Sequence, residues 1–170
     1  MSHPFFIRAA LFLAIAIIVQ SLRLIFPFIP APVNQFVLGS IINMLMVLAM
    51  LMTGNAWTAA IGLVLPLVAF LTGQLPLAPM IIVVGIGNVI YMMLAWRLFP
   101  RKAMYAAPIF KALLLFLGAK AVISMLELPD SAANVITLMM SWPQIITGTM
   151  GIIAAKKLLP RINQFRKSIT

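Results

Sequence analysis

A lysine, a serine and a glutamate recur along one apolar stretch at the spacing of a single helical face. Lys120, Ser124 and Glu127 are separated by four and then three residues, so on a helix they are neighbours. A charged side chain inside a bilayer costs at least a few kcal/mol. Because the chain has only two acidic residues, a permanent counter-ion for Lys120 is scarce. We interpret Lys120 as an anion-binding residue, supported by Ser124; the alternative is a structural pair with a carboxylate or carbonyl oxygen.

Two other basic residues lie within apolar stretches. Lys111 precedes Lys120 by nine residues, which at about 100° per residue places the two on opposite helical faces. Since Lys111 lies near the start of its helix, we expect its ammonium group to extend to the membrane surface. Arg23 lies at the end of the first helix, where it is either a second anion contact or a cation that extends outward.

The remaining candidate ligand-binding residues lie at a similar depth in other helices and loops. Polar side chains within a membrane need a partner or water, so this shared depth predicts one polar pocket. The residues are Asn34, Gln35, Gln74, Asn88, Ser141 and Trp142. A neutral pyrimidine-like or pyridoxine-like ring held by Asn88, Gln74 and Trp142 is the alternative to an anionic ligand.

The elements that position these residues are predicted membrane helices. The chain is 64% hydrophobic and 8% charged, whereas a soluble domain is about a quarter charged. Six segments approach the roughly 20 apolar residues that a span requires, and the first is interpreted as a membrane helix rather than a signal peptide. They are 5–25, 35–53, 56–73, 79–98, 105–127 and 134–158. We expect one all-α integral membrane domain over residues 1–170.

Basic residues and prolines add detail to this arrangement. With the N-terminus inside, nine of the twelve basic residues face the cytoplasm and both acids face outward. The sequence thus predicts a compact N-in/C-in bundle of six helices with an outward-facing ligand pocket. Pro66 and Pro143 cannot donate a backbone hydrogen bond, so each should free a carbonyl oxygen, that of Gly62 and that of Met139.

The composition excludes several kinds of chemistry. The chain has no cysteine and a single histidine, His3, so neither a cysteine nor a histidine metal site is expected. No phosphate-binding G-x-x-x-x-G-K-[ST] loop occurs. The basic residues flank apolar runs rather than form a polar patch, which disfavours nucleic acid and favours contact with the lipid bilayer. We expect neither an enzyme nor a bound cofactor.

Three stretches resemble the substrate-binding S-components of energy-coupling-factor (ECF) vitamin transporters. They are "RAALFLAIA", with Ala10 and Ala14 four residues apart, "NQFVLGSIINML" and "LTGQLPLAPMIIVVGIGNVIYMML". The resemblance implies a protein of the prokaryotic plasma membrane that captures a vitamin or vitamin precursor near the outer surface. It also implies a transmembrane coupling subunit that docks on Ala10 and Ala14, and two ATPase subunits supplied as separate chains.

The identity of the ligand stays open within this resemblance. Lys120 and Arg23 favour an anionic ligand that is pantothenate-like or nicotinate-like. A stand-alone small carrier or channel is the alternative function.

Overall fold

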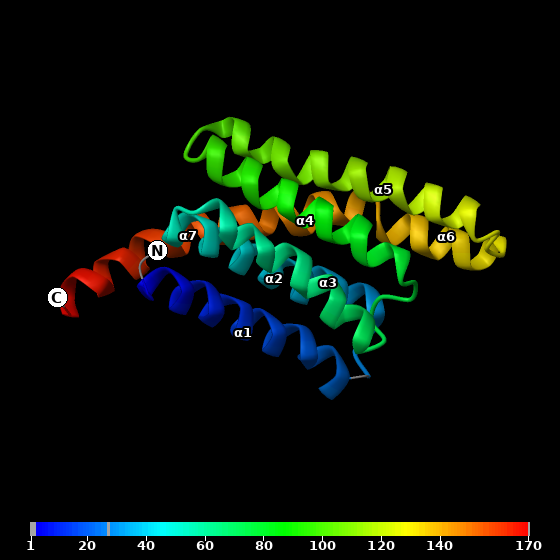
Figure 1. The fold of residues 1–170 in the computed structure, drawn as a ribbon, viewed down its shortest axis with the longest axis horizontal. Helices are drawn as coiled ribbons and strands as arrows, with labels where there is room; N and C mark the ends of the chain where they lie inside the picture. Colours follow the sequence, from blue (N-terminus) through cyan, green and yellow to red (C-terminus); the bar gives the residue numbers. More distant parts are fainter. Residues whose placement is uncertain (1–2, 27, 170) are drawn as a thin grey trace.

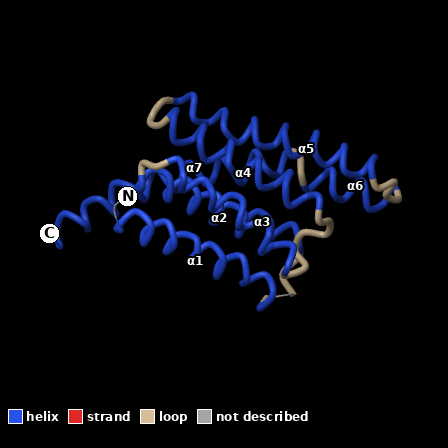
Figure 2. Tube along the Cα trace, viewed as in Figure 1, coloured by secondary structure: helices blue, strands red, loops and turns tan. Residues whose placement is uncertain are grey.

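The chain folds into helices joined by short loops. The computed structural model describes residues 3–26 and 28–169, and none of these lies in a strand (Figure 2). The elements are α1 (His3–Ile25), α2 (Ala31–Thr53), η1 (Ala56–Ala60), α3 (Ile61–Leu71), α4 (Pro79–Leu98), η2 (Lys102–Ala106), α5 (Ala107–Met125), α6 (Asp130–Met139) and α7 (Trp142–Ile169).

The helices lie side by side in an elongated bundle. α1 lies along one edge and α5 along the opposite edge, with α2, α3, α4 and α7 between them (Figure 1). α2 packs against α1, α4 and α7, and α5 packs against α4 and α7. The beginning of α1 and the end of α7 lie at the same end of the bundle, opposite α6.

The described residues contain five helical segments that are long and apolar enough to cross a membrane. They are Phe5–Ile25, Pro32–Thr53, Pro79–Leu98, Lys102–Met125 and Asp130–Gln164, and a shorter apolar unit covers Ala56–Leu71. The expected class, an all-helical multi-pass membrane protein, is confirmed. The segment expected at 56–73 is a 3-10 turn followed by a helix of 11 residues, shorter than a standard span.

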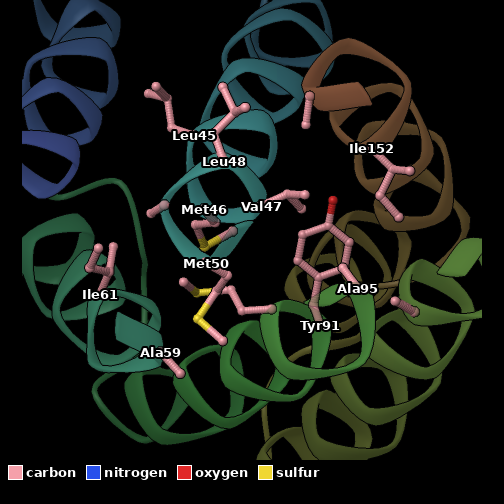
Figure 3. Close-up of a cluster of buried hydrophobic side chains, with 14 of the residues drawn as sticks. Leu45, Met46, Val47, Leu48, Met50, Ala59, Ile61, Tyr91, Ala95 and Ile152 are labelled. Atoms are coloured by element: carbon pink, nitrogen blue, oxygen red, sulfur yellow. The ribbon is translucent and has the colours of Figure 1, made fainter. Parts of the chain in front are cut away.

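The half of the bundle that contains the beginning of α1 and the end of α2 is filled by a methionine-rich apolar core (Figure 3). Met46, Met50 and Tyr91 are fully buried there. Methionine is unbranched and flexible, which lets it fill irregular gaps between helices. The Tyr91 hydroxyl donates a hydrogen bond of 2.8 Å to the carbonyl oxygen of Gly148, so a buried polar atom ties α4 to α7.

The segment expected as a single sixth helix is two helices. α6 ends at Met139 and α7 begins at Trp142, so Pro143 is the second residue of α7. Proline is favoured in the first turn of a helix, whereas in the interior it removes a hydrogen bond, which explains why a new helix begins just before Pro143. Asn134, on α6, is exposed.

Three glycines on α4 and α7 allow these helices to approach α2 and α5 closely. A Cβ atom on Gly151 would lie 2.7 Å from Asn43 Cβ and 2.8 Å from the Met44 backbone nitrogen. A Cβ atom on Gly87 would lie 2.1 Å from Leu115, and one on Gly148 would lie 2.7 Å from Pro108. Gly148 and Gly151 thus form a packing seam of small residues on α7. The last two contacts also fix the position of α5 against α4 and α7.

Candidate functional site

The helices also form a partly open cavity of about 160 Å³ that is lined by both apolar and polar side chains. Along α2 its lining extends from Gln35 to Met46, roughly 16 Å at 1.5 Å per residue. A cavity of about 150 Å³ accommodates a benzene-sized molecule, so this volume suits a ligand with one ring or a short chain. Its polar or charged lining residues are Gln20, Arg23, Gln35, Asn43, Gln74, Asn88, Lys111, Gln144 and Thr147.

Lys111 contributes a buried cation to this cavity. Its side chain is only 3% exposed, and Nζ donates a hydrogen bond of 2.8 Å to Asn43 Oδ1. The ammonium group also lies 5.1 Å from the centre of the Tyr91 ring, within the range of a cation–π interaction. An ammonium group has three hydrogen-bond donors. The Asn43 bond therefore leaves capacity for a ligand anion in the cavity.

Asn43 connects this lysine to α7. Its Nδ2 donates to Thr147 Oγ1 at 3.3 Å, and the Thr147 hydroxyl lies 3.4 Å from the Gln144 carbonyl oxygen, to which it donates. Asn43 thus uses its oxygen for Lys111 and its amide group for Thr147. This chain of bonds fixes the orientation of Asn43 and holds the acceptor for Lys111 in place.

The two carbonyl oxygens that the prolines were expected to free are both used in the cavity wall. Asn88 Nδ2 donates to the Gly62 carbonyl oxygen at 3.2 Å. Gln35 and Gln144 each donate through Nε2 to the Met139 carbonyl oxygen at 3.0 Å. Buried carbonyls without a partner are costly, so the prolines create acceptors that polar side chains must satisfy. The cavity amides are thereby anchored to α3 and to the α6–α7 junction.

The end of the cavity near the α1–α2 and α3–α4 loops holds a second cation. Arg23 lines it, and its Nε is fully buried without a hydrogen-bond partner among the described residues. Two glutamines flank this end: Gln20 Nε2 donates to the Leu65 carbonyl oxygen at 3.3 Å, and Gln74 Nε2 donates to the Gln20 carbonyl oxygen at 3.2 Å. The terminal nitrogens of a guanidinium group carry further N–H donors, and these are suited to bind a carboxylate.

No carboxylate of the chain neutralises these cations. The only two acids, Glu127 and Asp130, are both exposed in the α5–α6 region. Burial of a charge costs several kcal/mol unless it is compensated. The cavity therefore combines two basic side chains with no acidic side chain beside them, a setting in which a bound anion would favour the charged form of Lys111.

Lys120 and Ser124, expected as anion-binding residues, do not line this cavity. Both are exposed, as is Glu127, and Lys120 Nζ lies 5.1 Å from the centre of the neighbouring Phe116 ring. The helical phase was inferred correctly, because Lys111 and Lys120 do lie on opposite faces. The assignment of those faces was reversed, and the expectation that Lys111 extends to the membrane surface is wrong as well.

Packing of small residues explains which face of α5 turns inward. The buried face contains Pro108, Lys111, Leu115, Ala119 and Val122. Gly148 accommodates Pro108 and Gly87 accommodates Leu115, and Lys111 lies between these two contacts in the sequence. The alanines and proline of this face were a usable signal, because only small side chains permit close helix contacts.

The other expected ligand-binding residues divide into two groups. Four line the cavity: Arg23, Gln35, Gln74 and Asn88. Asn34 is instead buried and donates to the Ile29 carbonyl oxygen, and the Ser141 hydroxyl donates to the Leu138 carbonyl oxygen. Trp142 is 51% exposed and packs against Phe36, with 5.8 Å between ring centres. Sequence reasoning did not select Gln20, Asn43, Lys111, Gln144 or Thr147 as ligand contacts.

The structure places the expected docking residues on an outer face. Ala10 and Ala14 are both exposed on α1, and Ala10 also lines an apolar groove between α1 and the η1–α3 unit. In the part of the chain that the structure describes, no three residues with metal-ligating side chains come together. Neither the family models, nor the curated proteins, nor the solved structures give a match to this chain.

Proposed function

We propose that this protein is a membrane-embedded binding subunit that captures a small organic anion in the cavity between Lys111 and Arg23. The observation that carries the proposal is the buried Lys111 ammonium group, whose hydrogen-bond partner is a neutral amide. A carboxylate placed beside it would supply both the missing charge and a charge-assisted hydrogen bond. A permanently filled structural site would instead be expected to provide its own acid.

The orientation in the membrane is part of this proposal. Six passes, with both termini in the cytoplasm, place the basic ends of α4 and α7 inside and the Arg23 end of the cavity outside. The ligand then enters from the external side. This arrangement supports import rather than export.

We further propose that the chain acts as the S-component of an ECF-type importer in a prokaryotic plasma membrane. The sequence lacks a phosphate-binding loop, and in this proposal separate ATPase subunits supply the energy through a coupling subunit. The exposed Ala10 and Ala14 provide a surface with small side chains where another membrane helix can approach closely.

Binding is tested on the purified protein with acids and their matched neutral analogues. Native mass spectrometry and isothermal titration calorimetry would compare nicotinate with nicotinamide, and pantothenate with pantothenol. We expect at least one acid to bind and to exceed its neutral analogue by tenfold or more in affinity, since a hydrogen bond to a charged group contributes about 1.5–3 kcal/mol. Equal binding of acid and neutral analogue, or no binding of any acid, would overturn the anion-capture proposal.

Transport separates the proposed importer subunit from a stand-alone carrier. Uptake of the bound acid should require ATP in native membrane vesicles and should be absent in liposomes that contain this chain alone. Ala10→Trp and Ala14→Trp should abolish uptake and leave the affinity for the acid unchanged. Uptake by the chain alone would favour the carrier, and a loss of binding in both variants would contradict a docking role.

A further inference from the structure

Five side-chain amides line the cavity, and their orientations share one feature. Gln20, Gln35, Gln74, Asn88 and Gln144 each donate through their NH₂ group to a backbone carbonyl oxygen. A carbonyl oxygen can only accept a hydrogen bond. The assignment of nitrogen and oxygen in each amide is therefore chemically determined, because a flipped amide would place two oxygens together.

The amide oxygens of these cavity-lining residues consequently have no partner within the described residues. None of the five accepts a hydrogen bond from a residue that the structure describes, whereas Asn43 Oδ1 accepts from Lys111. They are not sealed within the protein either, because Arg23 Nε is the one fully buried side-chain atom without a partner in the described part of the chain. The wall thus contains unpartnered acceptor oxygens, and every one of the five amides except Gln74 also keeps a second N–H donor.

The unpartnered amide oxygens restrict the chemistry of the ligand further than the basic side chains do, because they favour a ligand with hydrogen-bond donors. A carboxylate satisfies the cations but offers nothing to the amide oxygens. A ligand that lacks hydrogen-bond donors would displace water from these oxygens and leave them without partners, which weakens binding. Hydroxyl or N–H groups on the same ligand remove that cost.

We infer that the ligand is a small carboxylate that also carries several hydroxyl or N–H donors, such as a polyhydroxy acid or an amide-containing hydroxy acid. The carboxylate binds the Lys111 ammonium group, and the donors bind the amide oxygens of the wall. This inference rests on the proposed function and narrows it, because flat aromatic acids without donors are excluded as preferred ligands.

The test compares two acids of the same skeleton. Shikimate and cyclohex-1-ene-1-carboxylate share the ring, the double bond and the carboxylate, and differ only in the ring hydroxyl groups. Pantothenate and nicotinate extend the comparison to a flexible acid with donors and a flat acid without them. Dissociation constants for the purified full chain would be measured by native mass spectrometry and calorimetry.

We expect an acid with donors to bind at least tenfold more tightly than its counterpart without donors in one or both comparisons. If the acids without donors bind as tightly or more tightly, the inference is wrong while the anion-capture proposal stands. If none of the four acids binds, both are overturned. The two failures are thus distinguishable.

A single substitution tests the contribution of one amide oxygen. Gln144→Met removes the Gln144 oxygen from the cavity but leaves the Met139 carbonyl oxygen paired with Gln35, so the α6–α7 junction keeps a partner. The affinity for the acid with donors should fall about fivefold or more, and the affinity for its counterpart should stay constant. An equal fall for both acids would contradict the inference, because a general disturbance of the fold would weaken both.

Discussion

Replacement of Lys111 by methionine separates the role of its charge in binding from its role in folding. Methionine retains an unbranched side chain that can fill the space next to Leu115 and Gly87, but it has no charge and no N–H donor. In the native protein the Lys111 ammonium group is 3% exposed and donates to Asn43 at 2.8 Å. Lys111→Met removes this cation without opening a large void.

The two consequences for free energy have different signs. Loss of the charge-assisted bond to a ligand carboxylate should cost about 1.5–3 kcal/mol of binding free energy, which corresponds to a roughly 10-fold to 100-fold increase in Kd. In the ligand-free protein, removal of a buried charge is favourable by several kcal/mol. Loss of the donor to Asn43 Oδ1 opposes this with about 1–3 kcal/mol. We therefore expect weaker binding without a fall in thermal stability.

The assay measures both quantities on the same preparation. Calorimetry gives the Kd of the tightest-binding acid, and thermal unfolding in detergent, without ligand, gives the Tm. Lys120→Met is the matched control, because Lys120 is exposed on the opposite face of α5 and should alter neither value. An unchanged Kd in Lys111→Met, or a large increase in Kd in Lys120→Met, would refute the placement of the anion beside Lys111.

Two further predictions concern the packing that shapes the cavity. Asn88→Leu should destabilise the protein by about 1–3 kcal/mol because it leaves the Gly62 carbonyl oxygen without a donor. Pro66→Ala restores a backbone N–H to α3, so Asn88→Leu should cost less stability in the Pro66→Ala background. Equal losses of stability in the two backgrounds, measured by thermal unfolding, would argue against a link between Pro66 and Asn88. Gly151→Ala should destabilise by about 1–3 kcal/mol because its Cβ would lie 2.8 Å from the Met44 backbone. Gly39→Ala is its control, since the nearest atom to that Cβ lies at 3.4 Å, and comparable Tm losses in both variants would contradict the packing argument.

Several features of the site followed from residue type and chain position. The prolines were expected to free the carbonyl oxygens of Gly62 and Met139, and the structure shows both oxygens accepting hydrogen bonds from amides of the cavity wall. What could not be predicted was which amides would reach them. Asn88 lies 26 residues from Gly62, and Gln35 lies 104 residues from Met139, so these pairs exist only after the helices have packed.

The sequence by itself determined that this chain is an all-helical membrane protein, because long apolar runs without charge can bury their backbone hydrogen bonds only as helices. It also determined that Lys111 and Lys120 lie on opposite faces, since helical phase depends only on spacing. The tertiary structure decided which lysine turns inward. The hydrophobicity of α5 does not distinguish its faces, whereas the glycines of α4 and α7 admit only the face of Pro108 and Leu115, and that face carries Lys111.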